Sequence, residues 1–222
     1  MAEIPETPGV WWAPRRASWW IGVLFAVGAT CFLVAPFPGV VQLFGSGVDA
    51  AIFFVGSIFF TTAAALQCRE TYHADHRIDW WSSVIQFAGT LLFNVDTFRA
   101  LQTGFDDVRY DRLVWTPDAV GSACFLISGY LAFIAVCSGP ACWRRRSPEW
   151  QIAAVNLLGC IAFGIAAVAS YVVPSTGSII DLAAANFATA FGGLCFLVGA
   201  VLLLPESARE LEAAATAGHL DP

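Results

Sequence analysis

The chain has 222 residues, of which 58% are hydrophobic and 13% are charged, and its formal net charge at pH 7 is −6. A mean hydropathy of +0.67 lies well outside the range of soluble globular proteins, and the negative charge argues against nucleic acid as a partner. The composition therefore indicates a protein that is surrounded mainly by lipid.

Six apolar segments follow one another along the chain, and each meets or approaches the roughly 20 residues that a helix needs to cross a bilayer. They cover residues 19–35, 49–67, 80–102, 118–138, 150–173 and 182–204. We therefore expect an all-α polytopic membrane bundle with six transmembrane helices, arranged as three tandem hairpins.

Polar stretches separate these hairpins. The expected parts are an N-terminal segment (1–18), hairpin 1 (19–67), a loop (68–79), hairpin 2 (80–138), a basic loop (139–149), hairpin 3 (150–204) and an acidic tail (205–222). Met1–Val10 is acidic and rich in Pro, so we expect no cleavable signal peptide, and the first apolar segment would direct insertion.

The basic residues predict the orientation, and all eleven of them are Arg. Six crossings would place eight on the side of the termini: Arg15, Arg16, Arg69, Arg77, Arg144, Arg145, Arg146 and Arg209. The opposite side has Arg99, Arg109 and Arg112 against seven acids, which leaves a net charge of −4 that would attract cations. The positive-inside rule then predicts a multi-pass protein of the bacterial plasma membrane with both termini in the cytoplasm.

Each hairpin repeats one spacing of Trp, Gly and Phe. The first segments carry Trp19–Gly28–Phe32, Trp80–Gly89–Phe93 and Trp150–Gly159–Phe163, and the second segments carry Gly56–Phe60, Gly121–Phe125 and Gly192–Phe196. The Trp suits the membrane interface, and the Gly lies about 13 Å deeper, where it lets a neighbouring backbone come close. The Phe, four residues later, shares that face and fills the groove beside the contact. Because all three hairpins begin on one side, we expect a pseudo-threefold axis along the membrane normal.

The segment Gly56-Ser57-Ile58-Phe59-Phe60, in a hairpin with a Gly-x-x-x-Phe partner, resembles the YrhK-like domain of small bacterial membrane proteins. In the other hairpins, Gly121-Ser122 and Gly192-Gly193 stand at the corresponding positions. That family is uncharacterised, so the resemblance implies a membrane hairpin and no activity.

Asp96 is the residue whose burial in a membrane costs most. It follows Trp80 by sixteen residues, which places it about 24 Å into its helix and some 6 Å below the outer edge of a ~30 Å core. An ionised carboxylate there costs a few kcal/mol, so Asp96 is a functional candidate. In one interpretation it lines a polar binding pocket with Asn94 and Asn186. In the other, Arg99 pairs with it three residues on and extends outward.

Three further acids, Asp49, Asp118 and Asp181, each open the second segment of a hairpin. An Asp at a helix N-terminus accepts backbone N–H bonds and complements the helix dipole. We interpret the three as helix caps, with a ring of acids around a cation entrance as the alternative.

The loop after hairpin 1 holds the one cluster of metal-ligand residue types, with His73, Asp75 and His76 as candidate ligands for Zn²⁺. His-x-x-His is not an established metal motif, so we interpret the loop as a solvated connection. Cys137 and Cys142 fall on the predicted cytoplasmic side, where thiols stay reduced, and we expect no disulfide.

No catalytic set and no cofactor motif can be placed in this sequence. We therefore expect a non-enzymatic accessory, scaffold or sensing subunit, whose partners are the lipid bilayer and a second copy or another membrane protein. One alternative is a small transporter or channel with a polar site around Asp96. The other is a metal-dependent membrane enzyme that uses the His73/His76 loop.

Overall fold

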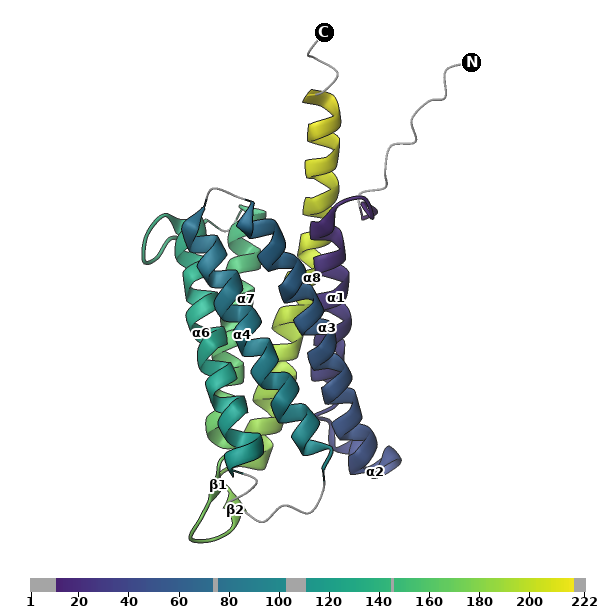
Figure 1. The fold of residues 1–222 in the computed structure, drawn as a ribbon, viewed down its shortest axis with the longest axis vertical. Coiled ribbons are helices and arrows are strands. Elements are labelled where there is room, and N and C mark those ends of the chain that lie inside the picture. The colour runs from purple at the N-terminus through teal and green to yellow at the C-terminus, as the bar shows by residue number, and fades with distance from the viewer. Residues whose placement is uncertain (1–10, 74–75, 103–110, 145, 218–222) are drawn as a thin grey trace.

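Seven α-helices make up most of the chain in the computed structural model, which describes residues 11–73, 76–102, 111–144 and 146–217 (Figure 1). The long helices are α1 (Ala17–Val34), α3 (Ser46–Tyr72), α4 (Arg77–Ala100), α6 (Thr116–Cys137), α7 (Pro148–Ala169) and α8 (Leu182–Ala217). The shorter elements are α2 (Pro38–Phe44), the π-helical turn η1 (Asp111–Trp115) and the paired strands β1 (Val172–Val173) and β2 (Ser178–Ile179). The prediction of an all-α fold is confirmed.

Local backbone features set several helix ends. Gly45 separates α2 from α3 with φ +84°, a conformation that a residue with a Cβ rarely adopts. Ser138 ends α6 in the left-handed region with φ +54°. Ser147 caps α7, where its Oγ accepts from the backbone N–H of Trp150 at 3.4 Å and Pro148 fills the first helical position.

The long helices contact one another in a closed order: α1, α3, α4, α6, α7, α8 and back to α1. Each expected hairpin is one adjacent pair in this ring, namely α1 with α3, α4 with α6, and α7 with α8. The helix α1 begins and α8 ends at one end of the ring, which we call the termini end, and the strands lie at the opposite end, the β-hairpin end (Figure 1). The ring encloses the centre of the molecule, so the inward-pointing side chains determine whether the centre is packed or contains a cavity, and which groups line it.

Five of the described helices are long and apolar enough to cross a membrane. They are Ala17–Val34, Ser46–Tyr72, Leu113–Cys137, Pro148–Ala169 and Leu182–Arg209. The helix α4 is long enough, but its 24 residues include two Arg, two Asp, a Gln and an Asn, and so it is less apolar. These features make the chain a multi-pass membrane protein, and the sixth crossing remains a prediction.

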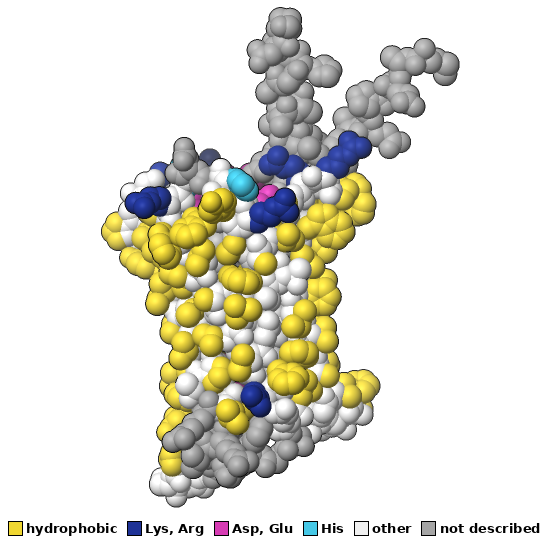
Figure 2. All heavy atoms as spheres, viewed as in Figure 1, with side chains coloured by type: hydrophobic (Ala, Val, Ile, Leu, Met, Phe, Trp, Pro, Cys, Tyr) yellow, Lys and Arg dark blue, Asp and Glu magenta, His cyan; other side chains and the backbone are white. Residues whose placement is uncertain are grey.

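The outer surface agrees with a lipid environment. Large apolar side chains cover the flank of the bundle over most of its height, and basic side chains gather at the termini end with one near the opposite end (Figure 2). A soluble monomer rarely exposes a continuous apolar surface of this extent. The side of the membrane on which each end lies remains a prediction.

The glycines of the repeated spacing face one another inside each hairpin. A Cβ built on the second glycine would lie 3.2 Å from the carbonyl oxygen of the first: Gly56 against Gly28, Gly121 against Gly89, and Gly192 against Gly159. Each glycine also lies against the Phe ring of the partner helix. The expected close approach of backbones, with Phe filling the adjacent groove, is confirmed.

Six phenylalanines, one from each long helix, pack at the centre of the ring as two triangles. In the first triangle, ring centroids lie 5.6–6.5 Å apart: Phe32, Phe93 and Phe163. In the second they lie 5.6–6.3 Å apart: Phe60, Phe125 and Phe196. None of the six is more than 6% exposed, so together they form an aromatic layer that fills the middle of the ring.

Candidate functional site

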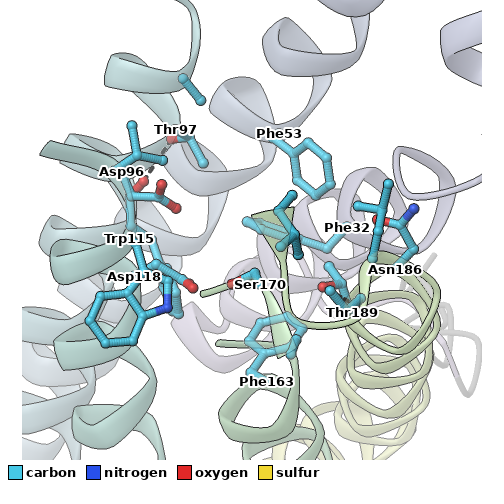
Figure 3. Close-up of a pocket in the computed structure, with 17 residues that line it drawn as sticks. Phe32, Phe53, Asp96, Thr97, Trp115, Asp118, Phe163, Ser170, Asn186 and Thr189 are labelled. Atoms are coloured by element: carbon cyan, nitrogen blue, oxygen red, sulfur yellow. Dashed lines mark hydrogen bonds between the residues drawn. The ribbon is translucent and has the colours of Figure 1, made fainter. Parts of the chain in front are cut away.

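A cavity of about 220 Å³ lies inside the ring, between the aromatic layer and the β-hairpin end (Figure 3). Phe32, Phe93 and Phe163 of the first triangle form its floor. Eleven of the seventeen described residues that line it are apolar. The six polar ones are Asp96, Thr97, Asp118, Ser170, Asn186 and Thr189. This combination of an apolar wall with a few polar groups is typical of a small-molecule site.

Asp96 of α4 and Asp118 of α6 form one wall of this cavity, and Asn186 and Thr189 of α8 form the opposite wall (Figure 3). Gly121 packs beside Phe93, so the two antiparallel helices are in register at that level. Asp96 follows Phe93 by three residues and Asp118 precedes Gly121 by three. Both carboxylates therefore lie about one turn above the floor. Among the described residues, neither forms a hydrogen bond or an ion pair with a partner.

The walls of the cavity use matching positions of the three hairpins. Phe53, Asp118 and Thr189 each precede the Phe of their own helix by seven residues, and all three line the cavity. Seven residues are close to two turns, so each shares the inward face of its Phe. Among the described lining residues, carboxylates come from hairpin 2 alone.

Asn94 does not line the cavity, although Asp96 and Asn186 do. Its Nδ2 donates to Thr61 Oγ1 at 2.8 Å, which links α4 to α3. Two residues on a helix are separated by about 200° around the axis, so Asn94 and Asp96 cannot share a face. The prediction that Asn94 and Asp96 line one pocket is therefore corrected: Asp96 lines the cavity and Asn94 does not, and helical periodicity explains the difference.

Arg99 forms no ion pair with Asp96, both of which lie in the described part of the chain. Its Nη1 donates instead to Gln102 Oε1 at 3.0 Å, at the end of α4. The long side chain reaches outward past the last turn, as arginines near helix ends do. Asp96 therefore lines the cavity without Arg99 as a partner, and the ion-pair interpretation is wrong.

Only one of the three acids interpreted as caps makes the expected bond. Asp181 Oδ1 accepts from the backbone N–H of Ala184 at 2.9 Å. The helices that contain Asp49 and Asp118 have no side-chain cap bond, and Asp49 Oδ1 is buried without a hydrogen-bond partner. Sequence reasoning missed Asp118 as a cavity residue, although its distance of seven residues from Phe125 indicates an inward position.

Two of the three candidate metal ligands, His73 and His76, lie at the termini end, far in the fold from the cavity. His73 follows α3 and His76 precedes α4, while Asp75 lies outside the described residues. Within the described residues there is no group of three His, Cys, Asp or Glu side chains that could hold a metal ion. The metal site at this loop therefore stays a prediction.

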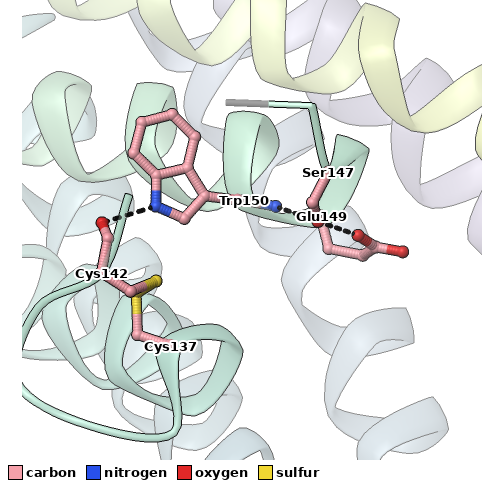
Figure 4. The surroundings of a disulfide bond; sticks show 5 residues. All are labelled: Cys137, Cys142, Ser147, Glu149 and Trp150. Atoms are coloured by element: carbon pink, nitrogen blue, oxygen red, sulfur yellow. Dashed lines mark hydrogen bonds between the residues drawn. A yellow bond between two sulfur atoms is a disulfide. The ribbon is translucent and has the colours of Figure 1, made fainter. Parts of the chain in front are cut away.

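A disulfide joins Cys137 to Cys142 with an S–S distance of 2.08 Å, so the prediction of free thiols at these positions is wrong (Figure 4). The left-handed Ser138 turns the chain at the end of α6 and brings the two Cα atoms to 5.3 Å, within the usual range for a disulfide. Trp150 Nε1 donates to the carbonyl oxygen of Cys142 at 3.0 Å and ties this turn to α7. Disulfides are rare in the cytosol, whereas the neighbouring arginines predict a cytoplasmic loop, so the two features give opposite indications of orientation.

Comparison with protein-family models finds no family that matches this chain. Comparisons with curated proteins and with solved structures also find no similar protein. The geometry of the cavity is therefore the basis for a functional assignment, and the YrhK-like resemblance stays an expectation from a few residues.

Proposed function

We propose that the protein is a non-enzymatic sensing or accessory subunit of the bacterial plasma membrane that binds a small solute in the cavity. One observation carries this proposal: two carboxylates without partners among the described residues face an amide and a hydroxyl across a cavity with an aromatic floor. A half-buried polar cluster of this kind, in a largely apolar cavity, is unfavourable unless an occupant satisfies it.

We also propose that all six long helices cross the bilayer around a pseudo-threefold axis. The closed order of helix contacts supports this, because α4 lies between α3 and α6, which are both apolar enough to span. Further support comes from the residue that follows the repeated glycine in the second helix of each hairpin. In all three hairpins this residue contacts a helix of the next hairpin. Ser57 Oγ lies 3.0 Å from Thr97 Oγ1, Ser122 Oγ donates to the Phe163 carbonyl at 3.4 Å, and Gly193 packs on the Leu33 backbone.

The aromatic layer favours binding over conduction. Its two triangles fill the ring below the cavity, so a solute that enters from the β-hairpin end meets a packed floor. A transporter, the second candidate, would need the layer to open during a cycle, and the polar cavity above the floor would then be its outward binding site. The orientation with both termini in the cytoplasm and membership of the YrhK-like family belong to this proposal as hypotheses.

Cysteine labelling tests the proposal that the cavity receives solutes from water. Asn186→Cys would place a thiol in the cavity, and Phe187→Cys would place one at similar depth on the outer surface, where Phe187 is 72% exposed. We expect a membrane-impermeant maleimide to react with the first variant from one side of sealed vesicles and not with the second, which faces lipid. Wild-type protein gives the background from native cysteines.

An Asn186→Cys thiol that stays unreactive in both sealed and permeabilised vesicles would refute a solute-binding cavity. Flux then separates the two candidate functions. Reactivity without uptake of any tested solute into liposomes supports a binding subunit, whereas uptake that Asp96→Asn abolishes in a folded protein supports a transporter.

A further inference from the structure

The charge of the cavity indicates the charge of its occupant. Asp96 and Asp118 are the only ionisable groups among the described lining residues, and they approach from neighbouring helices at the same height. Two carboxylates at one partly enclosed, largely apolar site repel each other and lose part of their hydration, which makes the empty site with two charges unfavourable. A cation between or beside them relieves both effects.

The shape and chemistry of the walls separate organic cations from metal ions. The oxygens of the cavity are spread over its walls: two carboxylates lie on one side, and the Asn186 amide and the Thr189 hydroxyl lie on the other. The remaining hydroxyls, of Thr97 and Ser170, already donate to backbone carbonyls of their own helices. A Ca²⁺ site instead gathers six to eight oxygens around one point, and Mg²⁺ requires a near-octahedral set. Five aromatic rings line the same cavity: Phe32, Phe53, Phe93, Trp115 and Phe163. The Trp115 ring is held by a 2.7 Å bond from Nε1 to the Ala167 carbonyl, and Phe53 packs edge-on against Phe32 with centroids 5.6 Å apart. Such rings attract quaternary and protonated amines through their faces.

The volume limits the size of this cation. Sites for drug-sized ligands occupy roughly 300–1,000 Å³, and the cavity of about 220 Å³ is smaller. From charge, aromatic walls and volume together, we propose that the cavity binds a small organic cation, a quaternary or protonated amine, with its charge at Asp96 and Asp118. This assignment rests on the proposed solute-binding function and names the class of its ligand.

The test uses a pair of probes that differ only in charge. Choline and 3,3-dimethylbutan-1-ol have the same shape, but the second has a neutral carbon in place of the ammonium nitrogen. We expect isothermal titration of the full-length protein in nanodiscs to detect choline and to give at least tenfold weaker binding for the alcohol. Sodium chloride at the same concentration should not displace choline.

Three variants assign the binding to the carboxylates. Asp96→Asn and Asp118→Asn keep the side-chain shape and remove one charge each, and we expect each to weaken choline at least tenfold. Asp49→Asn is the matched control, because Asp49 also lies in the first turn of a long helix but does not line the cavity. We expect it to bind choline as the wild type does.

The outcomes separate the ligand class from the proposed function. Equal binding of choline and the alcohol, or choline binding that neither Asn variant weakens, would overturn the cationic ligand and leave a solute-binding cavity. Absence of choline binding in a protein whose Asn186→Cys thiol reacts with maleimide would have the same meaning. If that thiol is also unreactive, the proposed function itself fails.

Discussion

The glycine Gly193 brings α8 directly against the backbone of α1, which belongs to another hairpin. A Cβ built on Gly193 would lie 2.6 Å from the backbone nitrogen of Leu33 and 2.9 Å from the carbonyl carbon of Phe32. Gly193→Ala therefore forces a methyl group into backbone atoms, which no change of rotamer can move aside. We predict that this single methyl group separates α8 from α1 and loosens the ring.

The magnitude follows from the distances. Carbon atoms in contact prefer about 3.5–4.0 Å, so the two helices must move apart by about 1 Å. Overpacking of this kind costs about 1–3 kcal/mol, and because the obstacle is backbone we expect about 2–3 kcal/mol in the free energy of unfolding. For a chain of this length, that corresponds to a fall of about 4–12 °C in Tm.

Gly164→Ala is the matched control, because it also adds a methyl group to a glycine inside a long helix. Its Cβ would meet only the end of the Leu126 side chain, at 2.9 Å, which can rotate away. Both variants gain the same helix propensity from Ala, so the difference between them isolates the backbone contact. Unfolding in mixed micelles with increasing SDS, followed by tryptophan fluorescence, measures both. If Gly193→Ala lies within about 1 kcal/mol of Gly164→Ala, the argument for a backbone-limited interface is refuted.

Two further predictions follow from the aromatic layer and the disulfide. Phe163→Ala should lower the free energy of unfolding by about 3–5 kcal/mol in the SDS titration, since it removes a ring from the aromatic layer; a loss under about 1 kcal/mol would mean that the layer is not packed. Iodoacetamide should label five of the seven cysteines in denatured, unreduced protein and all seven after reduction, because Cys137 and Cys142 are paired; mass spectrometry showing seven labels without reductant would exclude the disulfide.

Helical periodicity accounts for both the successes and the errors of prediction at the site. The Gly-x-x-x-Phe spacing places both residues on one face, and this face is the one that meets the partner helix. The same rule separates Asn94 from Asp96, so their expected grouping could have been rejected from the sequence. Helical periodicity could not decide whether Asp96 pairs with Arg99 or lines a cavity. Arg99 lies on a face of the helix that would allow the ion pair, and its rotamer depends on the surrounding helices.

Asp118 shows the limit of local reasoning. Its place in the first turn of a helix predicts a cap, and its distance of seven residues from Phe125 predicts an inward position. Both interpretations rest on neighbouring residues of one helix. The other helices of the ring decide whether Asp118 caps its helix or lines the cavity. The Cys137–Cys142 pair is similar, since the left-handed turn at Ser138, rather than the short spacing, brings the two cysteines together.

The amino-acid sequence by itself determined that the chain forms apolar helices and which face of each helix makes contact, because hydropathy, length and period are properties of a single segment. The tertiary structure alone decided that Asp96 and Asp118 meet in one cavity at one height. That result depends on the antiparallel register of α4 and α6, which the close contact of Gly89 and Gly121 sets, and on the aromatic layer that six helices complete together. A register and a closed ring are relations between segments, and they exist only when all the helices are packed.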